Sequence, residues 1–209
     1  MDLNRAETFD GKEFPLKLSS CWQVLMTTYP RLNPRKPSEK LAMSEDESVS
    51  ILAREINGQK EVKVILGQNE ILLLPGSELP EVLVNGQKVP VSGTVTHQVR
   101  QDDEVVFEIF QRGSHYISVV SEEYDVTLTY DGKRLMIEEP EMFSYSLRGL
   151  CGNYDGDSET DFMSPDNCPL TKPEEFIASY TLTKEQCEGE NLQKVKFLQK
   201  AACATISRR

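Results

Sequence analysis

The sequence is poor in the residues that build most catalytic centres. It contains two histidines, His97 and His115, and neither lies in a motif that would orient a nucleophile. It has no glycine-rich loop of the kind that cradles phosphate groups. Its five cysteines include no CxxC pair and no zinc-type spacing, which argues against thiol exchange and structural zinc. An enzyme is therefore the least favoured class, and we expect none.

Positive charge and long apolar runs are also scarce. The formal net charge is -11, and the basic residues are scattered along the chain. Such a surface repels phosphate backbones and anionic lipid, so we expect no nucleic-acid partner. Divalent cations or basic partners suit it better. No apolar run approaches the roughly 20 residues that a membrane-spanning helix needs, so we expect no transmembrane segment.

The five cysteines have spacings that we interpret as structural. Disulfides persist in oxidising compartments, so we expect a secreted, extracellular protein. Residues 1–11 lack the apolar core of a signal peptide. We therefore expect a segment of a longer chain whose signal peptide lies upstream, with one cysteine separated from its partner. Spacing by itself does not determine the pairing among Cys21, Cys151, Cys168, Cys187 and Cys203.

Alternation of apolar and polar residues predicts a mainly β fold. Strands are expected on both sides of three dipeptides that favour type I′ hairpin turns, Asn57-Gly58, Asn85-Gly86 and Asp131-Gly132. The flanking strands are expected at residues 50–56, 61–66, 82–84, 88–91, 126–130 and 134–137, and further strands at 21–26, 71–74, 104–110 and 116–120. Because turns and not helices join these short strands, the pattern predicts an antiparallel β-sandwich.

Three segments depart from this pattern. Residues 30–48 are rich in proline, serine and charge, which predicts a solvated surface loop; a regulatory or partner-binding loop is the alternative. Thr171 and Glu174 resemble a capping box, which predicts a short helix through Tyr180. Apolar residues at helical spacing predict a second helix over residues 190–205.

The most unusual segment is "GLCGNYDGDSETDF", residues 149–162, which places carboxylates and an amide on alternate positions. Oxygen-rich loops of this kind can hold a hard cation such as calcium. The segment is not an EF-hand, because Ser158 and Ser164 occupy the diagnostic glycine and glutamate positions. Composition alone favours an exposed acidic turn, since Asp, Asn, Gly and Ser are ordinary turn residues.

Two further motifs give a family resemblance. "TFDGKEF" at residues 8–14 and "SSCWQVL" at 19–25, paired with the acidic segment, resemble the opening and closing signatures of a von Willebrand factor type D domain. The hairpin series and Cys187 agree with it, so the resemblance spans residues 5–190. The run "CPLTKPEEFIASYTLTKEQC", residues 168–187, further resembles the C-terminal part of vitellogenins, particularly insect ones. We therefore divide the chain into a type D domain, residues 1–190, and a helical tail, residues 191–209.

The resemblance implies a calcium site built from both signatures. Its ligands would be Asp10, Asn153, Asp155 and Asp161, with Asp157 contributing through its backbone carbonyl. Thr160 stands where the family often has Asn or Asp. A site of residues so distant in sequence would make metal binding part of the folding free energy.

The resemblance also implies a pattern of disulfides. Cys21 and Cys187 match a pair that the family commonly forms. Cys151 matches a cysteine that usually pairs upstream of the TFDG motif, where this chain has none, so it would be a free thiol. Cys168 and Cys203 would then form the remaining pair.

The expected function follows from this resemblance. We expect a non-enzymatic, calcium-binding structural and interaction module of a secreted lipid-transport and yolk-storage protein. Its partners would be the lipid-carrying domains of the parent protein, and a receptor or cell surface. The alternative is an adhesion or matrix module of a mucin-like or clotting-type protein. That alternative predicts neighbouring cysteine-rich modules and intermolecular disulfides, and the sparse cysteines count against it.

Overall fold

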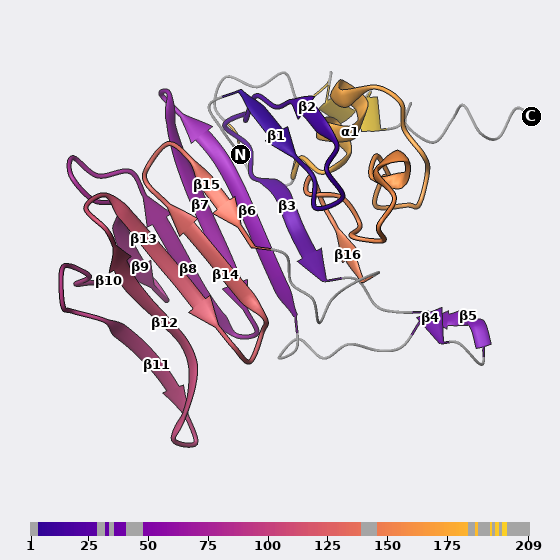
Figure 1. Ribbon diagram of the computed structural model, residues 1–209. Coiled ribbons are helices and arrows are strands. Elements are labelled where there is room, and N and C mark those ends of the chain that lie inside the picture. Colours follow the sequence, from indigo (N-terminus) through magenta and orange to yellow (C-terminus); the bar gives the residue numbers. More distant parts are fainter. Residues whose placement is uncertain are drawn as a thin grey trace, which may run out of the picture.

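Two antiparallel β-sheets dominate the computed structural model (Figure 1). The structure describes residues 4–28, 32–33, 36–40, 48–138, 146–183, 187, 193, 195–196 and 198–199. The mainly β, antiparallel architecture predicted from the sequence is confirmed. In the part of the chain described, no helix is long and apolar enough to cross a membrane.

The larger sheet has seven strands in the order β10-β9-β8-β7-β6-β3-β16. Its strands are β3 (Gln23–Thr28), β6 (Val49–Ile56), β7 (Gln59–Leu66), β8 (Asn69–Leu74), β9 (Glu81–Val84), β10 (Gln87–Val89) and β16 (Leu147–Arg148). From β6 to β10 each strand pairs with the next one in sequence. Asn57 and Asn85 have positive φ in two of the tight turns of this meander, as the predicted type I′ turns require. β3 precedes this meander in the sequence and β16 follows it, and the two strands pair with each other beside β6.

The smaller sheet is a five-stranded meander in sequence order. Its strands are β11 (His97–Gln101), β12 (Glu104–Arg112), β13 (Tyr116–Ser121), β14 (Val126–Tyr130) and β15 (Leu135–Ile137). The turn before β12 consists of Asp102 and Asp103, both with positive φ. This hairpin lacks the Asn-Gly or Asp-Gly signal, and β11 was not predicted.

The type I′ turn predicted at Asp131-Gly132 is wrong. Of these two residues only Gly132 has positive φ. The Asp131 carboxylate accepts hydrogen bonds from the backbone N–H groups of Lys133 and Arg134, at 2.9 and 2.6 Å. This local side-chain bonding favours a longer connection of residues 131–134 over a two-residue turn.

Two short hairpins lie outside the main sheets. β1 (Arg5–Glu7) pairs with β2 (Glu13–Pro15), and the connection between them carries the TFDG motif. β4 (Leu32–Asn33) pairs with β5 (Lys36–Lys40). The prediction of residues 30–48 as loop throughout is therefore wrong at these strands. Ser48 lies outside any strand, and residues 30–31, 34–35 and 41–47 lie outside the described residues.

The helical elements are short. Those with complete bounds in the described part of the chain are the 3-10 turn η3 (Ser158–Thr160) and the helix α1 (Pro173–Ser179). The predicted N-cap at Thr171 is wrong, because Lys172 holds that position without a side-chain cap. Pro173 at the first helical position lacks an N–H and so leaves one donor fewer to satisfy. Where residues of the predicted 190–205 helix are described, they are helical.

The core lies between the two sheets. Most of the largest fully buried side chains come from these sheets, namely Leu25, Met26, Ile51, Leu66, Ile71, Leu73, Phe107, Ile109, Ile117, Leu128 and Tyr130. The Tyr130 hydroxyl donates to the backbone oxygen of Lys60, which links the smaller sheet to β7. Trp22 is 5% exposed, as expected of a core residue, and Arg54 and Lys63 lie over its ring.

An aromatic cluster within the core supports the end of the acidic segment. Phe162 stacks on Phe176 of α1, with ring centroids 4.4 Å apart. Phe14 of β2 contacts both rings edge-on, at 5.3 and 5.7 Å, and Tyr180 contacts Phe176 at 5.5 Å. Aromatic pairs at these separations contribute beyond their buried area. The cluster therefore holds β2, residue 162 and α1 together.

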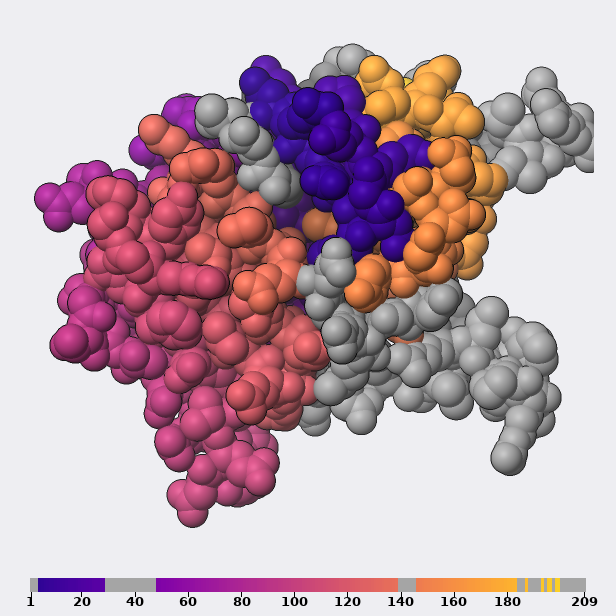
Figure 2. Space-filling model, viewed as in Figure 1, coloured from indigo at the N-terminus to yellow at the C-terminus, as the bar shows by residue number. Residues whose placement is uncertain are grey.

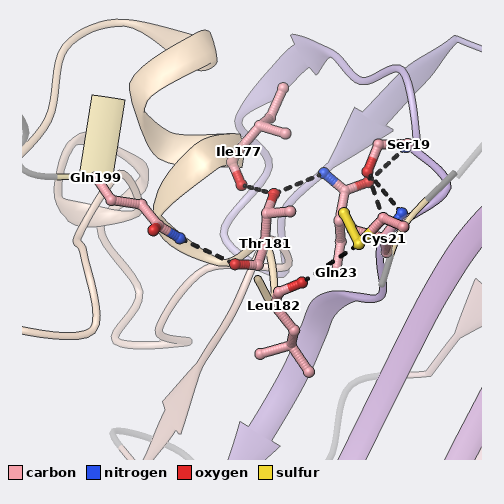
Figure 3. The surroundings of a disulfide bond; sticks show 8 residues. Ser19, Cys21, Gln23, Ile177, Thr181, Leu182 and Gln199 are labelled. Atoms are coloured by element: carbon pink, nitrogen blue, oxygen red, sulfur yellow. Dashed lines mark hydrogen bonds between the residues drawn. A yellow bond between two sulfur atoms is a disulfide. The ribbon is translucent and has the colours of Figure 1, made fainter. Parts of the chain in front are cut away.

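A disulfide joins Cys21 to Cys187 across a sequence separation of 166 residues (Figure 3). Nearby, the Gln23 side-chain amide donates to the Thr181 hydroxyl at 3.2 Å. Gln199 of the tail donates to the backbone oxygen of Thr181 at 2.9 Å. Cys168 is also disulfide-bonded, and its predicted partner, Cys203, lies outside the described residues.

Loss of the Cys21–Cys187 bond should destabilise the domain. We expect the double variant Cys21→Ser/Cys187→Ser to lose about 2–5 kcal/mol of unfolding free energy, because the bond restricts a long loop of the unfolded chain. Urea unfolding followed by circular dichroism measures the loss. Each single variant removes the same bond and should match the double variant. Additive losses in the single variants, or an unchanged midpoint in the double variant, would contradict this account.

Candidate metal site

Two segments far apart in sequence meet at one end of the larger sheet. They are residues 8–12, between β1 and β2, and the acidic segment, residues 149–162. Figure 2 shows them side by side on one face, indigo against orange. The backbone N–H of Phe9 donates to the oxygen of Cys151 at 2.9 Å, and the N–H of Cys151 donates to the oxygen of Leu25 at 2.8 Å. Strand β3 therefore supports the acidic segment, which in turn holds the TFDG connection.

Asp10 reaches across to the acidic segment with both carboxylate oxygens. Its Oδ2 accepts a hydrogen bond from the N–H of Asp155 at 3.1 Å, and its Oδ1 accepts from the N–H of Gly156 at 2.9 Å. Hydrogen bonds from N–H groups to a carboxylate are stronger than those between neutral groups. Asp10 thus fixes the backbone of the loop in which the other candidate ligands lie.

Asp155 lies at the centre of the loop's side-chain contacts. Its Oδ2 accepts from the side-chain amide of Asn153 at 2.8 Å, and its Oδ1 accepts from the N–H of Asp157 at 3.0 Å. The Thr160 hydroxyl lies 2.8 and 3.0 Å from the two carboxylate oxygens. Thr160 therefore orients Asp155.

Asp161 is the deeply buried member of the group, at 1% exposure. Its Oδ2 accepts a 2.6 Å bond from the Thr8 hydroxyl, and its Oδ1 accepts from the N–H of Asn153 at 3.3 Å. Burial raises the pKa of the Asp161 carboxyl to about 6, and the nearby Asp10 carboxylate adds to the rise. A buried carboxylate that faces another one is the environment that a bound cation would stabilise.

Asn153 carries the most informative atom of the site. The residue is 7% exposed, and its side-chain oxygen has no hydrogen-bond partner in the described part of the chain. Its side-chain nitrogen donates to Asp155, so the orientation of the amide is accounted for. A buried carbonyl oxygen without a partner costs about 1–3 kcal/mol. Amide oxygens are ligands that calcium prefers, so this atom and its carboxylate neighbours fit a hard cation.

Asp157 is placed differently from the other predicted ligands. Its side chain is exposed and caps η3 by accepting from the N–H of Glu159 at 3.0 Å. Its backbone oxygen accepts from the N–H of Thr160 at 3.0 Å. The structure thus gathers Asp10, Asn153, Asp155 and Asp161 into one network and directs the Asp157 carboxylate elsewhere.

The carboxylates of the network would not hold a metal by themselves. Within the described residues, no three side chains of His, Cys, Asp or Glu are grouped closely enough to bind an ion. Hydrogen bonds from backbone and hydroxyl donors occupy their oxygens instead. A cation here would need the amide oxygen of Asn153, and backbone oxygens or water, in addition to the carboxylates.

Three supporting residues were not predicted. Thr8 holds Asp161, and Lys12 donates to the Ser158 oxygen at 3.0 Å while lying 4.8 Å from the centre of the Phe162 ring. A Cβ on Gly152 would lie 2.1 Å from Asp161 Oδ1, so only glycine lets this carboxylate approach. All three lie in the quoted motifs, which could have signalled them: Thr8 and Lys12 in TFDGKEF, and Gly152 in the acidic segment. No local pattern predicts the contacts that Lys12 makes.

Cys151 is a free, buried thiol beside the site, at 8% exposure. Burial raises its pKa to about 12, and the Asp161 charge adds to the rise. Since the thiolate is the reactive form, the folded protein should protect this cysteine.

We expect Cys151 to react with iodoacetamide at pH 8 on the order of a hundredfold more slowly in the native state than in guanidinium chloride. Both access and the thiolate fraction increase on unfolding. Mass spectrometry of alkylated peptides under non-reducing conditions measures the two rates, with Cys151→Ser as the blank. Equal rates in the two states would show that the thiol is open to solvent.

Comparison with known proteins places these observations in a family. The family model described as von Willebrand factor type D domain matches residues 4–168, which include both halves of the site. Vitellogenin-1 of Solenopsis invicta is 36% identical over 100% of this chain and 12% of its own length. Vitellogenin-2 of Periplaneta americana is 25% identical over 88% of this chain and 9% of its own length. Vitellogenin-2 of Caenorhabditis elegans is 28% identical over 90% of this chain and 10% of its own length. The chain is therefore similar to a small part of several vitellogenins, and it belongs to the von Willebrand factor type D domain family.

Proposed function

We propose that this domain is a non-enzymatic, calcium-binding structural and interaction module. The observation that carries the proposal is the buried, unpartnered side-chain oxygen of Asn153. Asp155 lies beside it, and Asp10 and Asp161 belong to the same hydrogen-bonded network. This donor set consists of oxygen atoms alone. Calcium prefers such ligands, whereas zinc and copper prefer nitrogen and sulfur ligands.

The residues would act by joining two parts of the chain. Asp10 comes from the connection after β1, while Asn153, Asp155 and Asp161 come from the acidic segment. Bound calcium would supply positive charge that offsets the mutual repulsion of the carboxylates. Asn153 would offer its side-chain oxygen, and Asp157 its backbone oxygen. The N-terminal hairpin would then be tied to the acidic segment more firmly than by hydrogen bonds alone.

The wider role rests on the similarity to vitellogenins. The chain spans 12% of the length of the Solenopsis relative, so we place it within a longer protein of the same type. We propose that this parent protein is secreted, transports lipid and serves as a yolk store. The Cys21–Cys187 disulfide suits an extracellular location. The lipid-carrying domains of the parent, and a receptor or cell surface, are the proposed partners, and the net charge of -11 suits basic surfaces on them.

Calcium should raise the melting temperature of the domain. A ligand that binds only the folded state adds about 2.7 kcal/mol at a hundredfold excess over Kd, or on the order of 5–10 °C for a domain of this size. Differential scanning fluorimetry in EDTA, followed by titration to about 10 mM calcium, covers the affinities usual for extracellular modules. Magnesium chloride at equal ionic strength controls for charge screening.

Two isosteric variants sharpen this test. Asp155→Asn removes one charge from the site without changing its shape, and it should lose most of the calcium-dependent rise. Glu159→Gln makes the same change on an exposed side chain of the same loop, and it should keep the rise. If the unmodified domain melts at the same temperature in EDTA and in calcium, the acidic segment is a solvated turn and the proposal fails.

A further inference from the structure

The Thr8 hydroxyl lies in a buried chain of hydrogen bonds that ends on Asp161. Thr8 is 5% exposed. Its Oγ1 accepts a bond from the backbone N–H of Lys12 at 2.9 Å and lies 2.6 Å from Asp161 Oδ2. A hydroxyl has one proton to donate. Because the Lys12 amide approaches Oγ1 as a donor, the threonine proton is directed to the carboxylate.

The opposite oxygen of Asp161 is held as well. Oδ1 accepts from the N–H of Asn153 at 3.3 Å and occupies space that any side chain at position 152 would fill. The carboxylate is thus fixed on both sides, by Thr8 from one segment and by the backbone of residues 152–153 from the other. Threonine suits this role because its β-branched side chain has few rotamers.

We propose that Thr8 is the positioning residue of the calcium site, which orients Asp161 before the ion binds. This inference rests on the proposed calcium binding. Thr8 lies two residues before Asp10, so one short connection both supplies a ligand and aims another that is 153 residues away. A carboxylate that is already oriented loses little freedom when the ion binds, and this preorganisation strengthens affinity. Groups that orient metal ligands typically contribute 10–100-fold to metal affinity.

The test compares Thr8→Val, which keeps the shape and removes the hydroxyl, with Thr8→Ser, which keeps the hydroxyl. Isothermal titration with calcium chloride, after removal of metal with EDTA, gives Kd for each folded variant. We expect Thr8→Val to weaken calcium binding about tenfold or more, and Thr8→Ser to stay within about threefold of the unmodified domain. Thr8→Ala removes the hydroxyl without adding an apolar contact and serves as the second variant if Thr8→Val does not fold.

A merely structural role for Thr8 would give a different result. The melting temperature of Thr8→Val would then fall equally in EDTA and in calcium, and Kd would not change, which overturns the inference. Under the proposal, the fall in calcium exceeds the fall in EDTA.

A double-mutant cycle with Asp161→Asn tests whether Thr8 acts through this carboxylate. If it does, Thr8→Val should change Kd by less than about twofold in the Asp161→Asn background, because the two changes remove one interaction. Independent, additive effects would overturn the assignment of Thr8 to Asp161.

The proposed calcium binding and the proposed role of Thr8 fail separately. An unmodified domain that binds no calcium overturns both, whereas tight binding that is unaffected by Thr8→Val overturns only the role of Thr8.

Discussion

The burial of the Asp161 carboxylate is the constraint on which the candidate metal site of this domain depends. A buried carboxylate needs hydrogen-bond donors or a positive charge around it, because desolvation of an uncompensated charge is costly. Here the donors come from both ends of the domain, Thr8 on one side and the backbone of Asn153 on the other. The acidic segment must therefore lie against the β1–β2 connection if Asp161 is to be buried. Burial of the Asp161 carboxylate thus accounts for the position of both the acidic segment and the β1–β2 connection.

The sheets supply the rigid support that this arrangement requires. β3 lies between β6 and β16, and its Leu25 oxygen accepts from the N–H of Cys151, near the start of the acidic segment. At the other end of that segment, Phe162 is held in the aromatic cluster with Phe14 and Phe176. The loop is thus anchored at both ends on elements with buried side chains. Such anchoring limits the freedom of the residues between, which is the condition for a well-defined binding site.

Local signals made most of the fold predictable. The Asn57-Gly58 and Asn85-Gly86 turns were predicted because asparagine and glycine both adopt positive φ readily, and the two residues are adjacent in the sequence. Asp102 and Asp103 adopt the same backbone conformation without the glycine, so their hairpin gave no signal. The type I′ turn at Asp131-Gly132 was predicted but does not form. The Asp131 carboxylate accepts hydrogen bonds from the backbone N–H groups of Lys133 and Arg134, which favours a longer loop. The first error comes from a missing sequence signal, and the second comes from competition between side-chain hydrogen bonds and backbone preference.

The candidate site was predictable only in part and for a different reason. Alternating Asn and Asp residues mark an oxygen-rich loop, but composition alone could not separate it from an exposed turn. The family resemblance supplied Asp10, because no local pattern connects it to residues 153–161. Lys12 was missed because its contacts with Ser158 and Phe162 exist only in the folded state.

The distance along the chain between the two halves of the site also determines the order in which the domain can be completed. Both meanders join neighbouring strands through short turns, so they require little loop closure, whereas the Thr8–Asp161 contact closes a loop of 153 residues. During synthesis the ribosome adds Asp161 only after every strand of the two sheets has been made. A chain truncated between the last strand and residue 161 would retain its hairpins and lack Asp161, the buried carboxylate of the site. The hydrogen-bonded network between the two segments can therefore form only after the chain has been translated past its last strand and has folded.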